Sequence, residues 1–142
     1  MASANFTNLP RFMAKGDIDF DTLTAKVLLV SSIPSEANLD AWDYRNDIDN
    51  EITGTGYSAG GIAQAYTLDA LDTANNLQSI DYTDIVNGWT TATFSAVGAI
   101  IYKDTGNAAT DILMHFVDFG GTVTATAGNF SITYTGKFEI AR

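Results

Sequence analysis

The single histidine of this 142-residue chain, His115, is the only side chain whose ordinary pKa suits it to act as a base near neutral pH. In a Ser-His-Asp triad, the histidine lies between a nucleophilic serine and an orienting carboxylate. Aspartates are plentiful here, but the Gly-x-Ser-x-Gly pattern of many serine hydrolases is absent. Nor does any spacing single out the two carboxylates that a glycoside hydrolase needs. We therefore interpret His115 as an ordinary strand residue and predict a protein without catalytic residues.

Two acidic stretches, residues 17–21 and 47–51, are candidates for calcium sites. An EF-hand loop that began at Asp17 would need glycine at its sixth position and glutamate at its twelfth, and the sequence has Thr22 and Leu28 there. The second stretch fails in the same way. Zinc is disfavoured because the chain has no cysteine and one histidine. We predict no metal and no cofactor, with solvated acidic turns as the main interpretation; a calcium site of another kind stays open.

A glycine-rich segment, residues 54–61, precedes a β-rich region. It lacks the Lys-Ser/Thr pair of a phosphate-binding P-loop, and no βαβ context supports a dinucleotide site. We interpret its glycines as turn residues with positive φ just before a strand that begins at Ile62.

A short helical arm is predicted over residues 1–16. Thr7 or Asn8 could cap the helix, Pro10 suits its first turn and Gly16 could end it. Large apolar residues recur in this arm at about helical spacing, so it must be buried either on its own sheet or on a neighbouring molecule.

Six large apolar side chains are the predicted interface residues. Four lie in the arm, on the hypothesis that it reaches a partner, and two are tryptophans elsewhere in the chain. Aromatic residues are frequent at the centres of interfaces, although tryptophans are equally common in cores. The set comprises Phe6, Leu9, Phe12, Met13, Trp42 and Trp89.

The remaining chain predicts an all-β fold. β-branched and aromatic residues gather in seven segments separated by turn-like residues, with an irregular excursion over residues 34–61 that includes one predicted helical turn at 39–44. We predict one domain spanning 1–142, an antiparallel β-sandwich or jelly roll. The strands are expected at residues 23–32, 62–70, 77–82, 92–102, 111–119, 122–127 and 129–140, with turns at 72–76, 84–88, 103–107 and 120–121.

The net charge of −10 excludes several partners. Seven basic against seventeen acidic residues would repel nucleic acid and anionic membranes, so neither is expected as a partner. The first residues lack the basic region and apolar run of a secretory signal, which predicts synthesis in a cytoplasm.

Several blocks, in this order, resemble a family of small virion structural proteins of tailed bacteriophages. The most specific are Gly54-Thr55-Gly56-Tyr57 and Ile101-Tyr102-Lys103-Asp104-Thr105-Gly106, and further similarity is found at residues 8–19, 25–31, 50–61, 99–106 and 116–120. The segment 34–44 lies outside the resemblance. Some members resemble head decoration (cement) proteins with a jelly-roll fold, and the family has no catalytic residues to transfer.

The resemblance implies a non-enzymatic capsid decoration protein on the outer surface of the virion. Its partners would be the major capsid protein and further copies of itself, as a dimer or trimer. Two alternatives stay open: a structural protein of the neck, tail or baseplate, and a carbohydrate- or receptor-binding β-sandwich with exposed aromatic residues.

Overall fold

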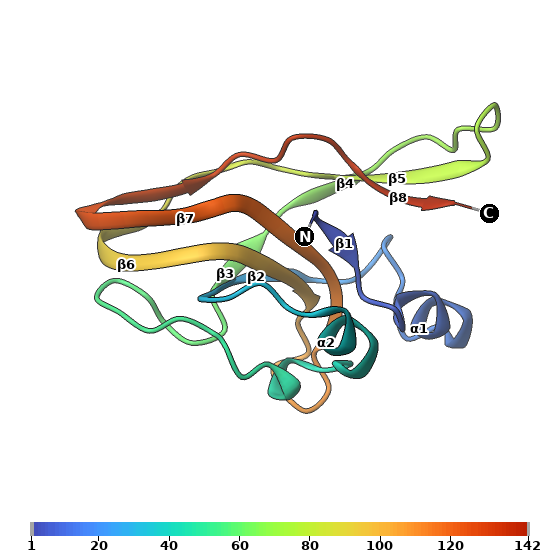
Figure 1. Ribbon diagram of the computed structural model, residues 1–142. Helices are drawn as coiled ribbons and strands as arrows, with labels where there is room; N and C mark the ends of the chain where they lie inside the picture. The colour runs from blue at the N-terminus through green and yellow to red at the C-terminus, as the bar shows by residue number, and fades with distance from the viewer. Residues whose placement is uncertain (1, 142) are drawn as a thin grey trace.

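The computed structural model describes residues 2–141 and shows a mostly β protein with antiparallel sheets (Figure 1). Met1, at the start of the predicted arm, and Arg142, at the end of the predicted domain, lie outside the described residues. The elements are β1 (Ala4–Asn5), α1 (Leu9–Lys15), β2 (Ala25–Val30), α2 (Glu36–Ala41), the 3₁₀ turn η1 (Arg45–Asp47), β3 (Ile62–Gln64), β4 (Tyr66–Leu68), β5 (Leu77–Tyr82), β6 (Ile85–Lys103), β7 (Ile112–Ile132) and β8 (Phe138–Ala141).

Two antiparallel sheets contain these strands. The larger sheet has the order β1-β7-β6-β2-β3 and the smaller has the order β4-β5-β8. Apolar side chains from both sheets, including Val27 of β2 and Ile80 of β5, form one continuous core cluster. A second cluster, which includes Leu39 of α2 and Leu28 of β2, lies on the other face of the larger sheet. Both faces of β2 are therefore buried, which explains its unbroken apolar run.

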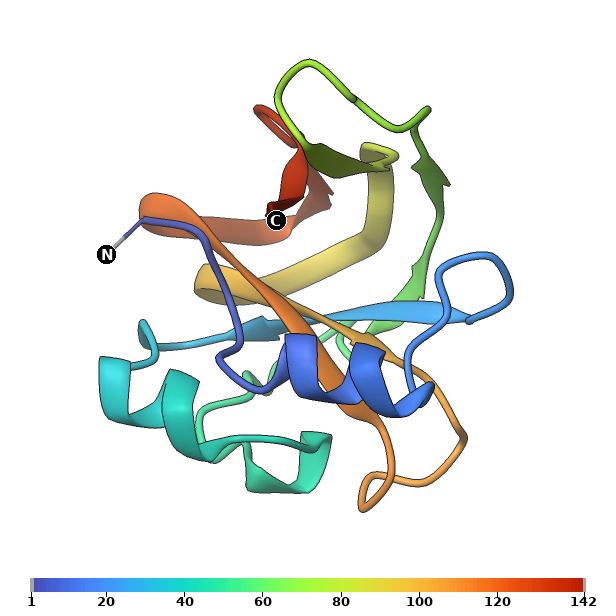
Figure 2. The same ribbon diagram turned by 90° about the vertical axis from the view of Figure 1, so that its right-hand side faces the viewer.

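The β6–β7 hairpin dominates the molecule and differs from the sequence prediction. Residues 84–88 and 120–121 were predicted as turns, but residues 85–88 belong to β6 and both glycines belong to β7. The prediction was wrong because the residues that make turns also make β-bulges. Asn87 and Gly120 have positive φ, and the register between the two strands shifts at both predicted turns, between Ile85 and Trp89 and between Ala96 and Gly98. Figure 2 shows that both strands of the hairpin bend and continue without a break.

Two predicted strands are divided between the sheets. The prediction for residues 62–70 becomes β3 in the larger sheet and β4 in the smaller one, separated by Ala65. The prediction for residues 129–140 becomes the end of β7 followed by β8. The predicted alternation is nevertheless confirmed at Phe130 and Ile132, which are buried on either side of the exposed Ser131.

The N-terminal segment contains the predicted helix but is not a free arm. Asn8 and Gly16 occupy its N-cap and C-cap positions, and Gly16 has a φ of +80°. Before the helix, β1 pairs with β7 at the edge of the larger sheet. The segment is thus packed into the chain's own fold, and an arm that reaches a partner stays a prediction.

The excursion over residues 34–61 is confirmed as a long, mostly irregular connection. Its helical turn begins earlier than predicted, because Ser35 forms a capping box with Asn38 and starts α2 at Glu36. The short helix α2 covers the second core cluster, and η1 follows it.

Candidate functional site

The most extensive polar site surrounds Asp111, whose side chain is fully buried at the start of β7. One carboxylate oxygen accepts hydrogen bonds from the Thr105 backbone N–H (2.7 Å) and hydroxyl (2.9 Å), and the other accepts from Arg45 Nε (2.7 Å). Burial alone would raise the pKa of Asp111. The hydrogen bonds from Thr105 and Arg45 outweigh burial and hold that pKa below its usual value. Asp111 is therefore an ionised, fully paired carboxylate.

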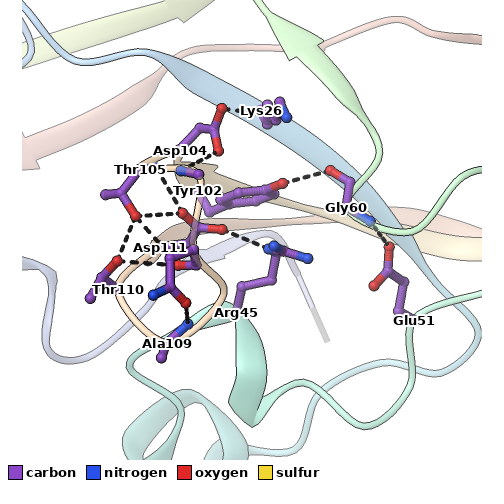
Figure 3. A network of polar contacts seen from close by, with 12 residues as sticks. Lys26, Arg45, Glu51, Gly60, Tyr102, Asp104, Thr105, Ala109, Thr110 and Asp111 are labelled. Atoms are coloured by element: carbon purple, nitrogen blue, oxygen red, sulfur yellow. Dashed lines mark hydrogen bonds and ion pairs between the residues drawn. The ribbon is translucent and has the colours of Figure 1, made fainter.

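A second set of contacts continues from Tyr102, whose ring lies 5.6 Å from the Arg45 guanidinium (Figure 3). The Tyr102 hydroxyl donates to the Gly60 carbonyl (2.6 Å), and the Gly60 N–H donates to Glu51 (2.6 Å). Glu51 also accepts from the hydroxyl of Tyr57 (2.8 Å). Burial raises the pKa of both tyrosines, so their hydroxyls stay protonated as donors.

These contacts join the excursion to the sheet. The two blocks most specific to the virion-protein resemblance, residues 54–57 and 101–106, both contribute to the network, through Tyr57 and through Tyr102 and Thr105. Gly60 and Gly61 have φ values of +88° and +69°, so the predicted glycine turn is confirmed. A Cβ on Gly61 would lie 1.8 Å from the Val27 carbonyl oxygen, so the excursion closes tightly on β2.

The network anchors the excursion to the sheet through groups that are paired within the chain. Its carboxylates, Glu51 and Asp111, are both hydrogen-bonded within the chain. Three clefts of about 290, 450 and 230 Å³ are lined by residues outside the network. Both carboxylates are thus held by the chain itself, and none of these clefts brings a substrate to them.

His115 lies at a second buried polar position and is enclosed by rings. Its Nδ1 is 2.6 Å from Asn5 Oδ1, and its ring centroid is 4.1 Å from that of Phe138 and 5.5 Å from that of Tyr82. Asn5 donates its own amide N–H to the Glu139 carbonyl, so its oxygen accepts from a protonated Nδ1. Burial lowers the pKa of His115 to about 3. The residue is a neutral part of the core, as expected from the sequence.

The acidic stretches considered for calcium form local turns. Asp19 accepts hydrogen bonds from the N–H of Asp21 and the hydroxyl of Thr22, and Asp47 accepts from the N–H of Asp43 and Tyr44. Within residues 2–141, no group of three or more His, Cys, Asp or Glu side chains could hold a metal ion.

The predicted interface residues are built into the core. Phe12 and Trp89 belong to the cluster between the sheets, Phe6 and Trp42 belong to the cluster under α2, and Met13 packs partly buried against the former. Leu9 is 1% exposed and Trp42 is 8% exposed. In this conformation these side chains stabilise the chain's own fold: residues 1–16 are buried on their own sheet, which is one of the two arrangements considered above. A partner that binds this conformation would need another surface.

That other surface is the part of the β6–β7 hairpin beyond the Gly98–Asp118 pair, which we call the neutral ribbon (residues 85–97 and 119–132). It contains no charged residue in a chain of net charge −10. Threonine is the most frequent of its exposed residues, and Thr124 on β7 is hydrogen-bonded to Ser95 on β6 (2.7 Å). This surface was not predicted from the sequence, although its two long uncharged runs could have been noticed there. Only the strand pairing brings these two runs side by side.

The 290 Å³ cleft opens beside the neutral ribbon. It is lined by apolar residues of β7, including Val117, Phe119 and Phe130, and by the segment 133–136. Val123 also lines it and is 42% exposed.

Comparison with known proteins found no matching family model, no matching curated protein and no matching solved structure. No helix in the described part of the chain is long and apolar enough to cross a membrane.

Proposed function

We propose that this protein is a structural component of a tailed-bacteriophage particle, a decoration protein that binds the outer surface of the head. The sequence blocks that resemble such proteins supply the support for the class of protein. Its fold, on this proposal, is an open β-sandwich related to a jelly roll, in which the N-terminal segment covers part of the β7 edge.

The observation that carries a binding role is the distribution of charge. The seventeen acidic residues all lie outside the neutral ribbon, which presents Thr93, Ser95 and Thr124 to solvent without any charge. Charged residues are depleted at the centres of interfaces because their desolvation is costly. The neutral ribbon is therefore the surface that we assign to the shell, with the major capsid protein as partner.

The mechanism would be mechanical. Each copy would bridge neighbouring shell subunits through a contact of modest area, and many such contacts on one closed shell would add up through multivalency. The acidic remainder would keep unassembled copies soluble in the host cytoplasm and away from DNA.

A non-enzymatic role agrees with the geometry of the polar groups. Asp111 and Glu51 are paired inside the network, and His115 is enclosed by rings. The sugar-binding alternative required Trp42, Trp89 or several tyrosines to be exposed together; both tryptophans are buried, and every tyrosine is buried or partly buried. We therefore favour the virion role.

The first test is the number of copies per particle, measured by quantitative mass spectrometry of purified virions against the major capsid protein. A number comparable to that of the major capsid protein is expected for a decoration protein. A handful of copies would instead place the protein in the neck, tail or baseplate, and its absence from virions would refute the proposal.

A second test measures binding to particles that lack the protein. Ser95→Glu adds a charge to the neutral ribbon, and Ala37→Glu adds the same charge to exposed α2. We expect Ser95→Glu to weaken binding by about tenfold or more, because a carboxylate would be desolvated at the contact, and Ala37→Glu to bind normally. Equal binding by both variants would contradict the assignment of the surface.

A further inference from the structure

The free edge of β7 is the second feature of the neutral ribbon. Within residues 2–141, β7 pairs with β6 on one side and with β1 on the other, but β1 reaches only His115 and Phe116. Ser3 extends this cover to the backbone N–H of Asp118. From residue 122 to residue 126, no other strand pairs with this edge, so alternate residues direct N–H and C=O groups outward.

Most protein edges of this kind are protected by charged residues or proline, which discourage pairing with another strand. Neither occurs from residue 119 to residue 136. The bulges around Thr91 and Ala127 limit the regular part of the edge, where Val123, Thr124 and Ala125 oppose Ala96, Ser95 and Phe94. The edge is therefore short, but it is open.

The side chains beside this edge of β7 are apolar on one face of the sheet. Val123 points toward the cleft that Phe119 and Phe130 also line, and it remains 42% exposed there. The opposite face carries Thr122, Thr124 and Thr126, all exposed. An added strand would gain backbone hydrogen bonds and could also cover Val123.

We propose that this edge pairs antiparallel with the same edge of a second copy across a two-fold axis. A two-fold contact places each surface against itself, so it is stable only where the surface does not repel itself. Two copies with ten net negative charges each repel one another, and the neutral ribbon is the surface where no like charges face each other. The antiparallel arrangement also allows both strands to exchange their outward N–H and C=O groups.

The resulting dimer extends the larger sheet across both copies and leaves the threonine-rich outer face continuous. Because the regular edge is short, the contact falls among small interfaces, and we expect a dissociation constant on the order of 10–100 µM. This inference does not depend on the proposed function, because it concerns the isolated protein.

The test is sedimentation velocity over a concentration series on wild type and two matched variants. Val123→Glu places like charges at the two-fold axis, whereas Val86→Glu makes the same change at a more exposed position outside the cleft. We expect the wild type to dimerise, Val123→Glu to weaken the dimer by about tenfold or more, and Val86→Glu to behave as the wild type. A monomeric wild type, or equal weakening by both variants, overturns the proposal.

Hydrogen exchange on the wild type provides a measurement that does not depend on any variant folding. The amides of residues 121–127 should exchange more slowly as the concentration rises through the dimerisation range. The exchange rates of amides in the loop between β4 and β5, which contains Leu71, should not change. If self-association protects other segments, the contact is elsewhere. If the isolated protein stays monomeric but Val123→Glu loses binding to particles, the edge takes a strand of the shell and the second copy is excluded.

Discussion

Asp111 illustrates how a buried charge can be tolerated in a chain with few cations. Its carboxylate loses its hydration, and three hydrogen bonds from Thr105 and Arg45 replace that hydration. Such a pair adds little over an apolar core of equal volume, but removing one partner leaves the other buried and unpaired. The pair therefore specifies where the excursion attaches.

Replacing Asp111 tests this role. Asp111→Ala leaves Arg45 and Thr105 without their acceptor, and we expect the free energy of unfolding to fall by about 3 kcal/mol. Asp49→Ala removes an exposed carboxylate and should change it by less than about 0.5 kcal/mol. Urea denaturation measures both, and similar losses in the two variants would contradict the role of the network.

His115 predicts a pH dependence of stability. Its pKa is about 3 in the folded protein, below the value near 6.5 of an unfolded chain, so the unfolded state binds a proton that the folded state does not. Stability should therefore decrease as the pH falls below about 6.5, by about 1.4 kcal/mol per pH unit, and His115 should contribute no pH dependence above that.

The control is His115→Gln, which cannot titrate. Denaturation between about pH 6.5 and pH 5 isolates the histidine, because carboxylates titrate at lower pH. We expect the wild type to lose stability over this range with a slope that the variant lacks. The same slope in both proteins would assign the effect to other groups.

At the scale of elements, two glycines with similar φ allow the cost of a left-handed backbone to be measured apart from the cost of a close steric contact. Gly61 (φ +69°) has the Val27 backbone against the site of a Cβ, whereas Gly106 (φ +83°) has no atom within 4 Å of it. Gly106→Ala should cost about 1 kcal/mol for the left-handed backbone. Gly61→Ala should cost about 3 kcal/mol, because β2 and the excursion must also separate. Thermal or urea unfolding measures the difference, and equal costs would refute the close approach.

The N-terminal segment makes a second prediction at this scale. Phe6 is 1% exposed in the cluster under α2, so Phe6→Ala should cost about 3 kcal/mol through lost burial and an internal cavity. Arg11→Ala, at an exposed position of α1, should change stability by less than about 0.5 kcal/mol. If both variants are equally stable, residues 1–16 are a detachable arm after all.

Charge governs the behaviour of the whole molecule. Both copies in the proposed dimer carry a net charge of −10, and salt screens charge repulsion over about 10 Å at 0.1 M. We expect the dimer to become tighter as the salt concentration rises, since the contact itself is neutral. Sedimentation at several salt concentrations measures this; weakening by salt would indicate attractive charge pairs and a different contact.

Local patterns were sufficient for several features of this protein. The Gly16 C-cap of α1, the glycine turn before Ile62 and the alternation at Phe130 and Ile132 all depend on nearby residues. The mostly β character also follows from the threonine and β-branched content. These features could be predicted because their physical causes lie within a few residues of one another.

Other features depended on residues that are distant in the sequence. Glycines 120 and 121 were compatible with both a turn between strands and a bulge within one strand, and the pairing of Asp118 and Val123 on either side of them with β6 selected the bulge. Phe6 and Trp89 were suitable for a core or an interface, and the closing of the two sheets placed them in the core. The Asp111 network and the neutral ribbon join segments tens of residues apart. Composition by itself determined a β-rich, acidic chain without cysteine chemistry; tertiary structure decided which apolar and charged groups became buried, because burial depends on which segments pack together.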